Sequence, residues 1–236
     1  MWCRDDDACR DSPALRRLLE IAATARIPLA LAVIPALVED SLVDRVENAP
    51  ALTILQHGYA HRNHAPAGKR NWELGDHRPI EDVVAELEKG RSELARRFGR
   101  RFLPVLVPPW NRIDARVANR LPDAGFDGLS TFGVRTSETP AIVQRNTHVD
   151  LIAWRRGRLF IGQDAAIERL VAHLGARREG RADATEPTGI LTHHLDLDGG
   201  AFSFLEELAL RTQAHGGATW IAAEAVFRPA ISVRSA

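Results

Sequence analysis

The sequence predicts an α/β fold in which a parallel sheet closes into a distorted barrel. Short apolar runs alternate with longer amphipathic stretches almost from one end of the chain to the other, and this alternation is typical of parallel strands joined by helices. No G-x-G-x-x-G follows the first apolar run, which argues against an open dinucleotide-binding sheet. Polar residues instead follow several different runs, as in barrel enzymes, whose catalytic residues gather at the C-terminal ends of strands.

Each predicted strand is a short apolar run that ends at polar or turn-forming residues. The strands are expected at 2–6, 28–34, 51–56, 102–107, 128–132, 149–154, 189–193 and 218–222. The stretches between them have apolar residues at helical spacing and predict helices at 13–25, 37–47, 80–98, 113–124, 164–178 and 201–214. The helix at 80–98 is the clearest, because acidic residues occupy its first turn. We expect residues 1–236 to form a single domain.

Composition and charge exclude several classes of protein. Lys plus Arg equals Asp plus Glu at 31 each, so the formal net charge is zero and attraction to nucleic acid or an anionic membrane is not expected. No apolar stretch reaches the roughly 18 residues that span a bilayer. The acidic run near the start is unlike a secretory signal, and Cys3 and Cys9 suit a reducing compartment as thiols. We therefore expect a cytoplasmic protein, whose oligomeric state the sequence leaves open.

Three consecutive aspartates, Asp5, Asp6 and Asp7, end the first predicted strand. Adjacent carboxylates repel one another unless a positive group lies among them. Alternation along a strand sends Asp5 and Asp7 to one side and Asp6 to the other until the chain turns. A helix N-cap is the plainer interpretation, but the helix that begins at Pro13 already has capping residues directly before it. The cluster is therefore predicted to bind a metal or to take part in catalysis.

Three histidines follow the third predicted strand within eight residues, at His57, His61 and His64. Two imidazoles at i and i+4 lie on one face of a helical turn and can bind a single metal ion. Surface histidines without a function are the alternative, since an H-x-x-x-H spacing also arises by chance. We favour a metal site at His57 and His61.

The predicted strand 189–193 ends in His193, and His194 follows it. Alternation sends the two side chains in opposite directions, so one can face the barrel mouth while the other packs in the core. Imidazole titrates near neutral pH, which suits a general acid. The residues alone do not decide which of the two histidines has this role.

The segment after the strand 102–107 contains Pro108, Pro109, Trp110 and Asn111. Two prolines restrict the backbone, and the face of Trp110 can stack on a sugar ring, although ordinary packing would also explain it. We predict a substrate-binding wall from Pro109, Trp110 and Asn111. Tyr59 is added because its backbone N–H, or one near Trp110, could stabilise an oxyanion.

Taken in order, these clusters resemble the motifs of the polysaccharide deacetylase family (carbohydrate esterase family four, with the chitooligosaccharide deacetylase homology domain). That family begins with T-F-D-D-G, in which the first aspartate is the catalytic base and the second binds the metal. Here Asp6 and Asp7 match this pair, with Asp5 as an inserted residue. The resemblance therefore implies Asp6 as the base and Asp7 as a ligand, and a frame that uses Asp5 and Asp6 stays open.

The later motifs match in part. H-[ST]-x-x-H matches His57 to His61 with Gly58 in the hydroxyl position, and R-x-P-[FYW] matches 107–110 without its arginine, for which Arg4 or Arg112 could substitute. The closing L-x-H nominates His193 as the general acid. Asp150 and Trp154 could stand in for an aspartate-tryptophan motif.

The resemblance implies a distorted (β/α)7 barrel that hydrolyses an acyl group, N- or O-acetyl, from a carbohydrate with the help of a divalent metal ion, most readily Zn²⁺. The ion would be held by Asp7, His57 and His61, leaving positions for water and the substrate carbonyl. Two alternatives stay open. One is an amidohydrolase that acts on a small non-sugar amide, and the other is a non-catalytic relative that keeps the metal and binds sugar.

Overall fold

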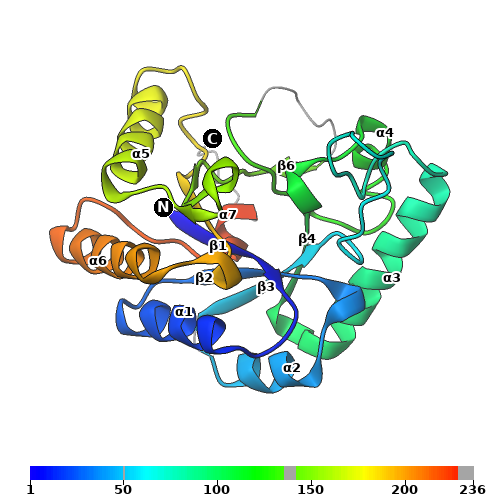
Figure 1. The fold of residues 1–236 in the computed structure, drawn as a ribbon, viewed down its shortest axis with the longest axis horizontal. Helices are drawn as coiled ribbons and strands as arrows, with labels where there is room; N and C mark the ends of the chain where they lie inside the picture. Colours follow the sequence, from blue (N-terminus) through cyan, green and yellow to red (C-terminus); the bar gives the residue numbers. More distant parts are fainter. Residues whose placement is uncertain (50, 136–141, 228–236) are drawn as a thin grey trace, which may run out of the picture.

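Parallel strands form the centre of the fold in the computed structural model, which describes residues 1–49, 51–135 and 142–227. Eight of them make one sheet, in the order β6-β5-β4-β3-β2-β1-β10-β7. Their bounds are β1 Trp2–Ala8, β2 Leu29–Val33, β3 Leu52–His57, β4 Phe102–Val107, β5 Gly128–Leu129, β6 Val143–Gln144, β7 Val149–Asp150 and β10 Gly189–Thr192. Most of the helices lie around the outside of these strands (Figure 1).

The two edges of the sheet are joined by a single stretch of chain, residues 143–150. At its start β6 pairs with β5, and at its end β7 pairs with β10. Between these two strands, Thr147 forms a parallel bridge with Phe132, which follows β5. The sheet therefore curls on itself into the distorted barrel that the sequence predicts.

Seven α-helices occur in the described part of the chain. They are α1 Pro13–Thr24, α2 Asp40–Glu47, α3 Ile80–Phe98, α4 Ala115–Ala118, α5 Gln163–Arg178, α6 Gly199–His215 and α7 Ala223–Phe227. Ser12 caps α1 by accepting the backbone N–H of Leu15, and Asp198 caps α6 in the same way. None of these helices combines the length and the apolar character that crossing a bilayer requires.

Four predicted elements differ clearly from the structure. The predicted strand 128–132 is reduced to the two residues of β5. The segment 218–222 is not a strand: it makes two backbone hydrogen bonds with Met1 and then leads into α7, and only Trp220 of its five residues is buried. The predicted strand 149–154 divides into β7 and β8 (Ile152–Ala153), and β8 pairs antiparallel with β9 (Leu159–Phe160). The helix predicted at 113–124 is reduced to α4, with turns on its C-terminal side.

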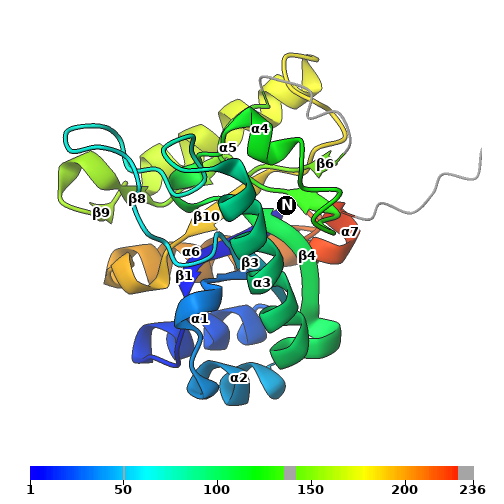
Figure 2. The same cartoon turned by 90° about the vertical axis from the view of Figure 1, so that its right-hand side faces the viewer.

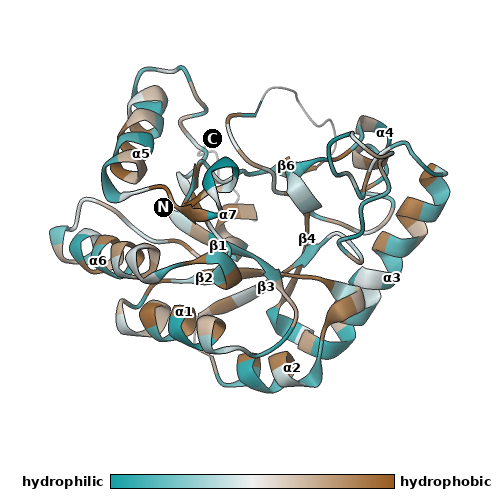
Figure 3. Cartoon of the chain, in the orientation of Figure 1, coloured by the Kyte–Doolittle hydropathy of each residue, from teal (hydrophilic) through white to brown (hydrophobic). Residues whose placement is uncertain are grey.

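One end of the barrel is filled by apolar side chains. Trp2, at the start of β1, meets Phe227 of α7 edge-on with 5.8 Å between the ring centres, and both side chains are buried. Small residues of β2, Ala30 and Ala32, belong to the same cluster. Figure 3 shows apolar colours along the strands and on the inner face of α3. With one end closed in this way, the polar strand ends gather at the other.

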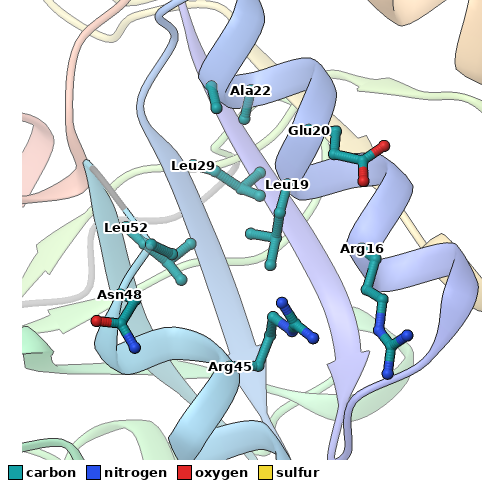
Figure 4. Close-up of a pocket in the computed structure, with 10 residues that line it drawn as sticks. Arg16, Leu19, Glu20, Ala22, Leu29, Arg45, Asn48 and Leu52 are labelled. Carbon is teal, nitrogen blue, oxygen red and sulfur yellow. The ribbon is translucent and has the colours of Figure 1, made fainter.

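The connections that follow the strands project from the open end of the barrel. Figure 2 shows the long connection between β3 and α3 on the same side as the β8–β9 hairpin. A surface groove beside α1 and α2 lies toward the opposite end, because it is lined by the first residues of β2 and β3, Leu29 and Leu52 (Figure 4). Two arginines of that groove, Arg16 and Arg45, both pair with Asp11, so part of their positive charge is neutralised.

Candidate metal centre and active site

Asp7, His57 and His61 meet at the open end of the barrel. The Oδ1 atom of Asp7 lies 3.0 Å from Nε2 of His57 and 3.2 Å from Nε2 of His61. One donor atom from each residue falls within 4.8 Å of the others. The structure therefore brings together the three residues that the sequence nominates as metal ligands.

The three side chains can approach one another because the backbone is left-handed at two of these residues. Asp7 has φ 69° and His61 has φ 53°, values that non-glycine residues adopt at a cost and mainly at functional sites. The pairing of β1 with β2 also shifts register between Asp5 and Ala8. Asp7 consequently turns toward the two histidines, whereas Asp5 lies against His194. The expectation from alternation that Asp5 and Asp7 share one side is therefore wrong.

The donor atoms fit a divalent cation. Nδ1 of His57 lies 3.0 Å from the carbonyl oxygen of Val107, so a neutral His57 donates there and presents the lone pair of Nε2 to Asp7. Asp7 Oδ1 is buried and receives no hydrogen bond. The carboxylate oxygen of Asp7 and the lone pair on Nε2 of a neutral His57 are both acceptors, and at 3.0 Å they repel each other unless a positive charge lies between them. Zinc ligands at about 2 Å in tetrahedral geometry lie roughly 3.3 Å apart, close to the observed spacings.

The electrostatic field of the cluster agrees with metal binding at two of the three residues, Asp7 and His61. Burial opposes the charged form of His57, but the carboxylates of Asp7 and Asp6 outweigh it and raise the pKa of His57. Burial also opposes ionisation of Asp7, but the nearby histidines lower its pKa well below the usual range. Burial, with the charge of His57, lowers the pKa of His61. The lowered pKa values of Asp7 and His61 favour the ionised carboxylate and the neutral imidazole that metal binding requires, whereas His57, with its raised pKa, must give up a proton when a metal ion binds.

Asp6 is held beside the cluster by a buried arginine. Nε of Arg4 donates to Asp6 Oδ1 at 2.8 Å and Nη2 donates to Oδ2 at 3.0 Å, a bidentate pair with fixed geometry. Arg4 also donates to Ser130 Oγ at 2.6 Å and to Asn111 Oδ1 at 2.9 Å. Arg112 instead donates to the backbone of Asn71. Arg4 is thus the arginine that orients Asp6.

The two histidines after β10 point in opposite directions, as predicted. His193 Nε2 lies 3.9 Å from Asp6 Oδ2, and its ring meets Trp154 edge-on at 4.6 Å. Trp154 in turn donates to Asp150 Oδ2 at 2.7 Å. Burial raises the pKa of Asp150, although the charge of His193 opposes this. His193 therefore faces Asp6, with Asp150 and Trp154 next to it.

His194 is turned into the core, where it pairs with Asp5. Its Nδ1 lies 2.5 Å from Asp5 Oδ2, and its backbone N–H donates to Asp5 Oδ1 at 2.9 Å. Burial opposes the charge on His194, but Asp5 outweighs it and raises the pKa of His194. Thr192 also donates to Asp5. This pair fastens the end of β10 to the end of β1 and does not reach the metal cluster.

The residues of the predicted substrate wall lie in different surroundings. The ring of Trp110 lies 4.4 Å from that of His61, and Asn111 belongs to the Arg4 network. Pro109 is buried against Gly58. Tyr59 lies apart from the cluster, because its ring faces Lys89 of α3 and its backbone N–H is bound by a carboxylate. It is therefore not placed to stabilise an oxyanion at the cluster.

That carboxylate belongs to Glu73, a residue that the sequence analysis missed. Glu73 is buried and contacts the backbone of the segment that carries His61. The one local clue is an acidic residue between two apolar ones, Trp72 and Leu74, in an otherwise polar loop. A contact with residues more than ten positions away cannot be inferred from that clue alone.

Comparison with known proteins places the fold among carbohydrate esterases. Similar solved structures include a family 4 carbohydrate esterase from Streptomyces lividans in complex with acetate, with TM-score 0.60, 15% identity, and coverage of 92% of this chain and 88% of that chain. A peptidoglycan N-acetylglucosamine deacetylase matches with TM-score 0.60 and 18% identity, covering 95% and 86%. A CE4 family pseudoenzyme from Bacillus anthracis matches with TM-score 0.60 and 14% identity, covering 92% and 61%.

No protein-family model and no curated protein matches the sequence of this chain. The likeness is thus one of structure and extends over nearly the whole chain, at identities that show the fold alone. It confirms the distorted (β/α)7 barrel that the motif resemblance implies. This chain has the fold of the family 4 carbohydrate esterases.

Proposed function

We propose that this protein is a metal-dependent deacetylase that removes an N- or O-acetyl group from a carbohydrate. The observation that carries the proposal is the Asp7–His57–His61 cluster beside an aspartate held by a buried arginine. The motif order, the fold and two similar structures that are named as an esterase and a deacetylase support it. We assign Zn²⁺ to the cluster, because two imidazoles and one carboxylate with open positions are typical of catalytic zinc.

A divalent cation bound at this cluster supplies Lewis acidity, which polarises a carbonyl and lowers the pKa of water. Asp6, oriented by Arg4, accepts a proton from the attacking water as the new carbon–oxygen bond forms. His193 gives a proton to the departing nitrogen or oxygen as the bond to the acyl carbon breaks. The products are acetate and the free amine or alcohol, and Trp110 offers its face to the sugar ring.

The two alternatives differ from this proposal in testable ways. An amidohydrolase for a small amide would use the same Asp6 and His193 but would not need a sugar-stacking wall. A non-catalytic relative is favoured by one observation, namely that a pseudoenzyme is among the similar structures. The presence of Asp6 and His193 within 3.9 Å of each other, a carboxylate and an imidazole that could serve as base and acid, favours catalysis over it.

The proposal is tested by measuring acetate release from N-acetylglucosamine oligomers. We expect no release by the metal-free protein and restored release after one equivalent of Zn²⁺ is added. Zinc binding without acetate release from N- or O-acetylated sugars would favour the non-catalytic relative. Release from small amides alone would favour the amidohydrolase.

We also propose in which compartment the reaction takes place. The sequence predicts a cytoplasmic protein, and there the substrate would be an acetylated intracellular sugar derivative or a nucleotide-sugar. Neutral overall charge gives no reason to expect nucleic acid or a membrane surface as a partner.

His193 and His194 should respond differently to replacement by alanine. We expect His193→Ala to lower kcat by about 10²–10⁴, the range of general-acid catalysis, with zinc retained. We expect His194→Ala to lower the melting temperature instead, because it leaves the buried Asp5 without its partner. Measuring kcat, zinc content and melting temperature for both variants separates the roles. A folded but inactive His194→Ala alongside an active His193→Ala would transfer the acid role to His194.

A further inference from the structure

The segment that carries His57 and His61 lacks the hydroxyl found in the motif it resembles, and Gly58 stands in that place. The backbone there is left-handed at two positions, with φ 55° at Gly58, which glycine adopts readily, and φ 53° at His61, which costs energy for a residue with a side chain. Something other than a side-chain hydroxyl must therefore hold this segment in the conformation that brings both imidazoles to Asp7.

Glu73 provides a buried anion against the backbone of this segment. Its Oε1 accepts the N–H of Ala60 at 2.8 Å and that of Arg62 at 3.2 Å, and its Oε2 accepts the N–H of Tyr59 at 3.2 Å. Only 1% of Glu73 is exposed. Three N–H groups of a turn that converge on one carboxylate form an anion-binding concavity, and hydrogen bonds to a charged group are the stronger ones.

Gly58 and Glu73 depend on each other sterically. A Cβ atom added to Gly58 would lie 2.0 Å from Oε2 of Glu73 and 2.6 Å from Cγ of Pro109. No side chain at position 58 can therefore coexist with the carboxylate in its present place. The Glu73 carboxylate can therefore occupy its place only because position 58 carries no side chain, and hence no hydroxyl.

Glu73 is itself anchored to the wall of the barrel. The next residue, Leu74, is buried and forms a parallel bridge with Ile113. Its carbonyl oxygen also accepts the backbone N–H of Asp114 at 2.8 Å. The carboxylate therefore reaches the histidine segment from a residue whose neighbour is bonded to the segment that follows β4.

We propose that Glu73 is a positioning residue for the metal centre: its carboxylate fixes the backbone from Tyr59 to Arg62 and so aims His61 at the site formed by Asp7 and His57. This inference rests on the proposed metal-dependent function. Groups behind the ligands of a metal site typically change its affinity by about 10–100-fold when they are removed. The effect of Glu73 is expected in that range.

The test measures zinc binding by the metal-free, full-length protein, with titration calorimetry for affinity and the visible spectrum of the Co²⁺ form for ligand geometry. We expect Glu73→Gln, which keeps one acceptor oxygen, to weaken zinc binding by about 10-fold, and Glu73→Ala to weaken it by up to about 100-fold. The Co²⁺ spectrum should shift in both variants. Glu86→Gln is the matched control, since Glu86 pairs with Arg78 on the same side of the protein and touches no ligand, and it should bind zinc as the wild type does.

A purely structural role would lower the melting temperature of both variants and leave the zinc affinity and the Co²⁺ spectrum at their wild-type values. That result would overturn the inference. If Glu73→Ala fails to fold, the isosteric Glu73→Gln decides the question by the same two readouts. Failure of the wild type to bind zinc would instead overturn the proposed function, and with it the role of Glu73.

Discussion

Replacing His57 by alanine is expected to remove zinc and acetate release together. His57 is buried at the end of β3, its Nδ1 is directed at the carbonyl of Val107, and its Nε2 faces Asp7. It is therefore the most rigidly held of the three proposed ligands, and a three-ligand site without one imidazole loses most of its affinity. Zinc measured after dialysis should fall from one equivalent to background, and activity should fall with it.

His64→Ala is the matched control for this experiment. His64 lies on the same connection as His61, but it does not belong to the cluster, and its backbone N–H bonds to the carbonyl of Trp72. We expect this variant to keep zinc and activity. Full zinc occupancy in both His57→Ala and His61→Ala would show that the ligand set is wrong.

Asp6→Asn is expected to keep zinc while kcat falls by about 10²–10⁴, the range of general-base catalysis. The amide keeps the shape of the side chain but cannot accept the proton of the attacking water. Asp7→Asn should show the opposite pattern and lose zinc, because a neutral amide is a weak partner for a divalent cation. Zinc content and kcat measured on the same samples distinguish the two aspartates.

Two further results complete this comparison. Asp6→Asn leaves buried Arg4 without a charged partner, so its melting temperature should also fall, and circular dichroism must show that the variant is folded at the assay temperature. Asp5→Asn should lose stability but keep zinc, because Asp5 contacts His194 and Thr192. Loss of zinc in Asp6→Asn and its retention in Asp7→Asn would mean that Asp5 and Asp6 form the base and ligand pair.

Much of the barrel could be predicted because each strand is a local apolar run. The limits of β4 and α3 agree with the predicted 102–107 and 80–98. The prediction of a strand at 218–222 failed because a short apolar run is not specific for a strand: this segment forms hydrogen bonds with Met1, buries only Trp220 and does not pair in the sheet. The division of 149–154 into β7 and β8 depends on pairing with a hairpin partner, β9, that a single run does not reveal.

The ligand residues could be found because Asp7 and His57 lie at the ends of strands and His61 follows shortly after one, and parallel strands bring their C-terminal ends together. What the sequence could not supply were contacts across the fold. Arg4 and Asp6 are only two residues apart, yet the choice between Arg4 and Arg112 required the geometry. Glu73 acts on backbone N–H groups, which carry no sequence pattern. The turn at Asp7 depends on a left-handed conformation that aspartate adopts only in suitable surroundings.

The central claim is that Asp7, His57 and His61 together hold one catalytic cation, and anomalous diffraction at the zinc absorption edge tests it most directly. Crystals of the zinc-loaded protein should show one strong peak at the open end of the barrel, about 2.0–2.2 Å from Nε2 of both histidines and from an oxygen of Asp7. A peak bound by Asp5 and Asp6, or a zinc-loaded protein with no peak at these three residues, would contradict the account.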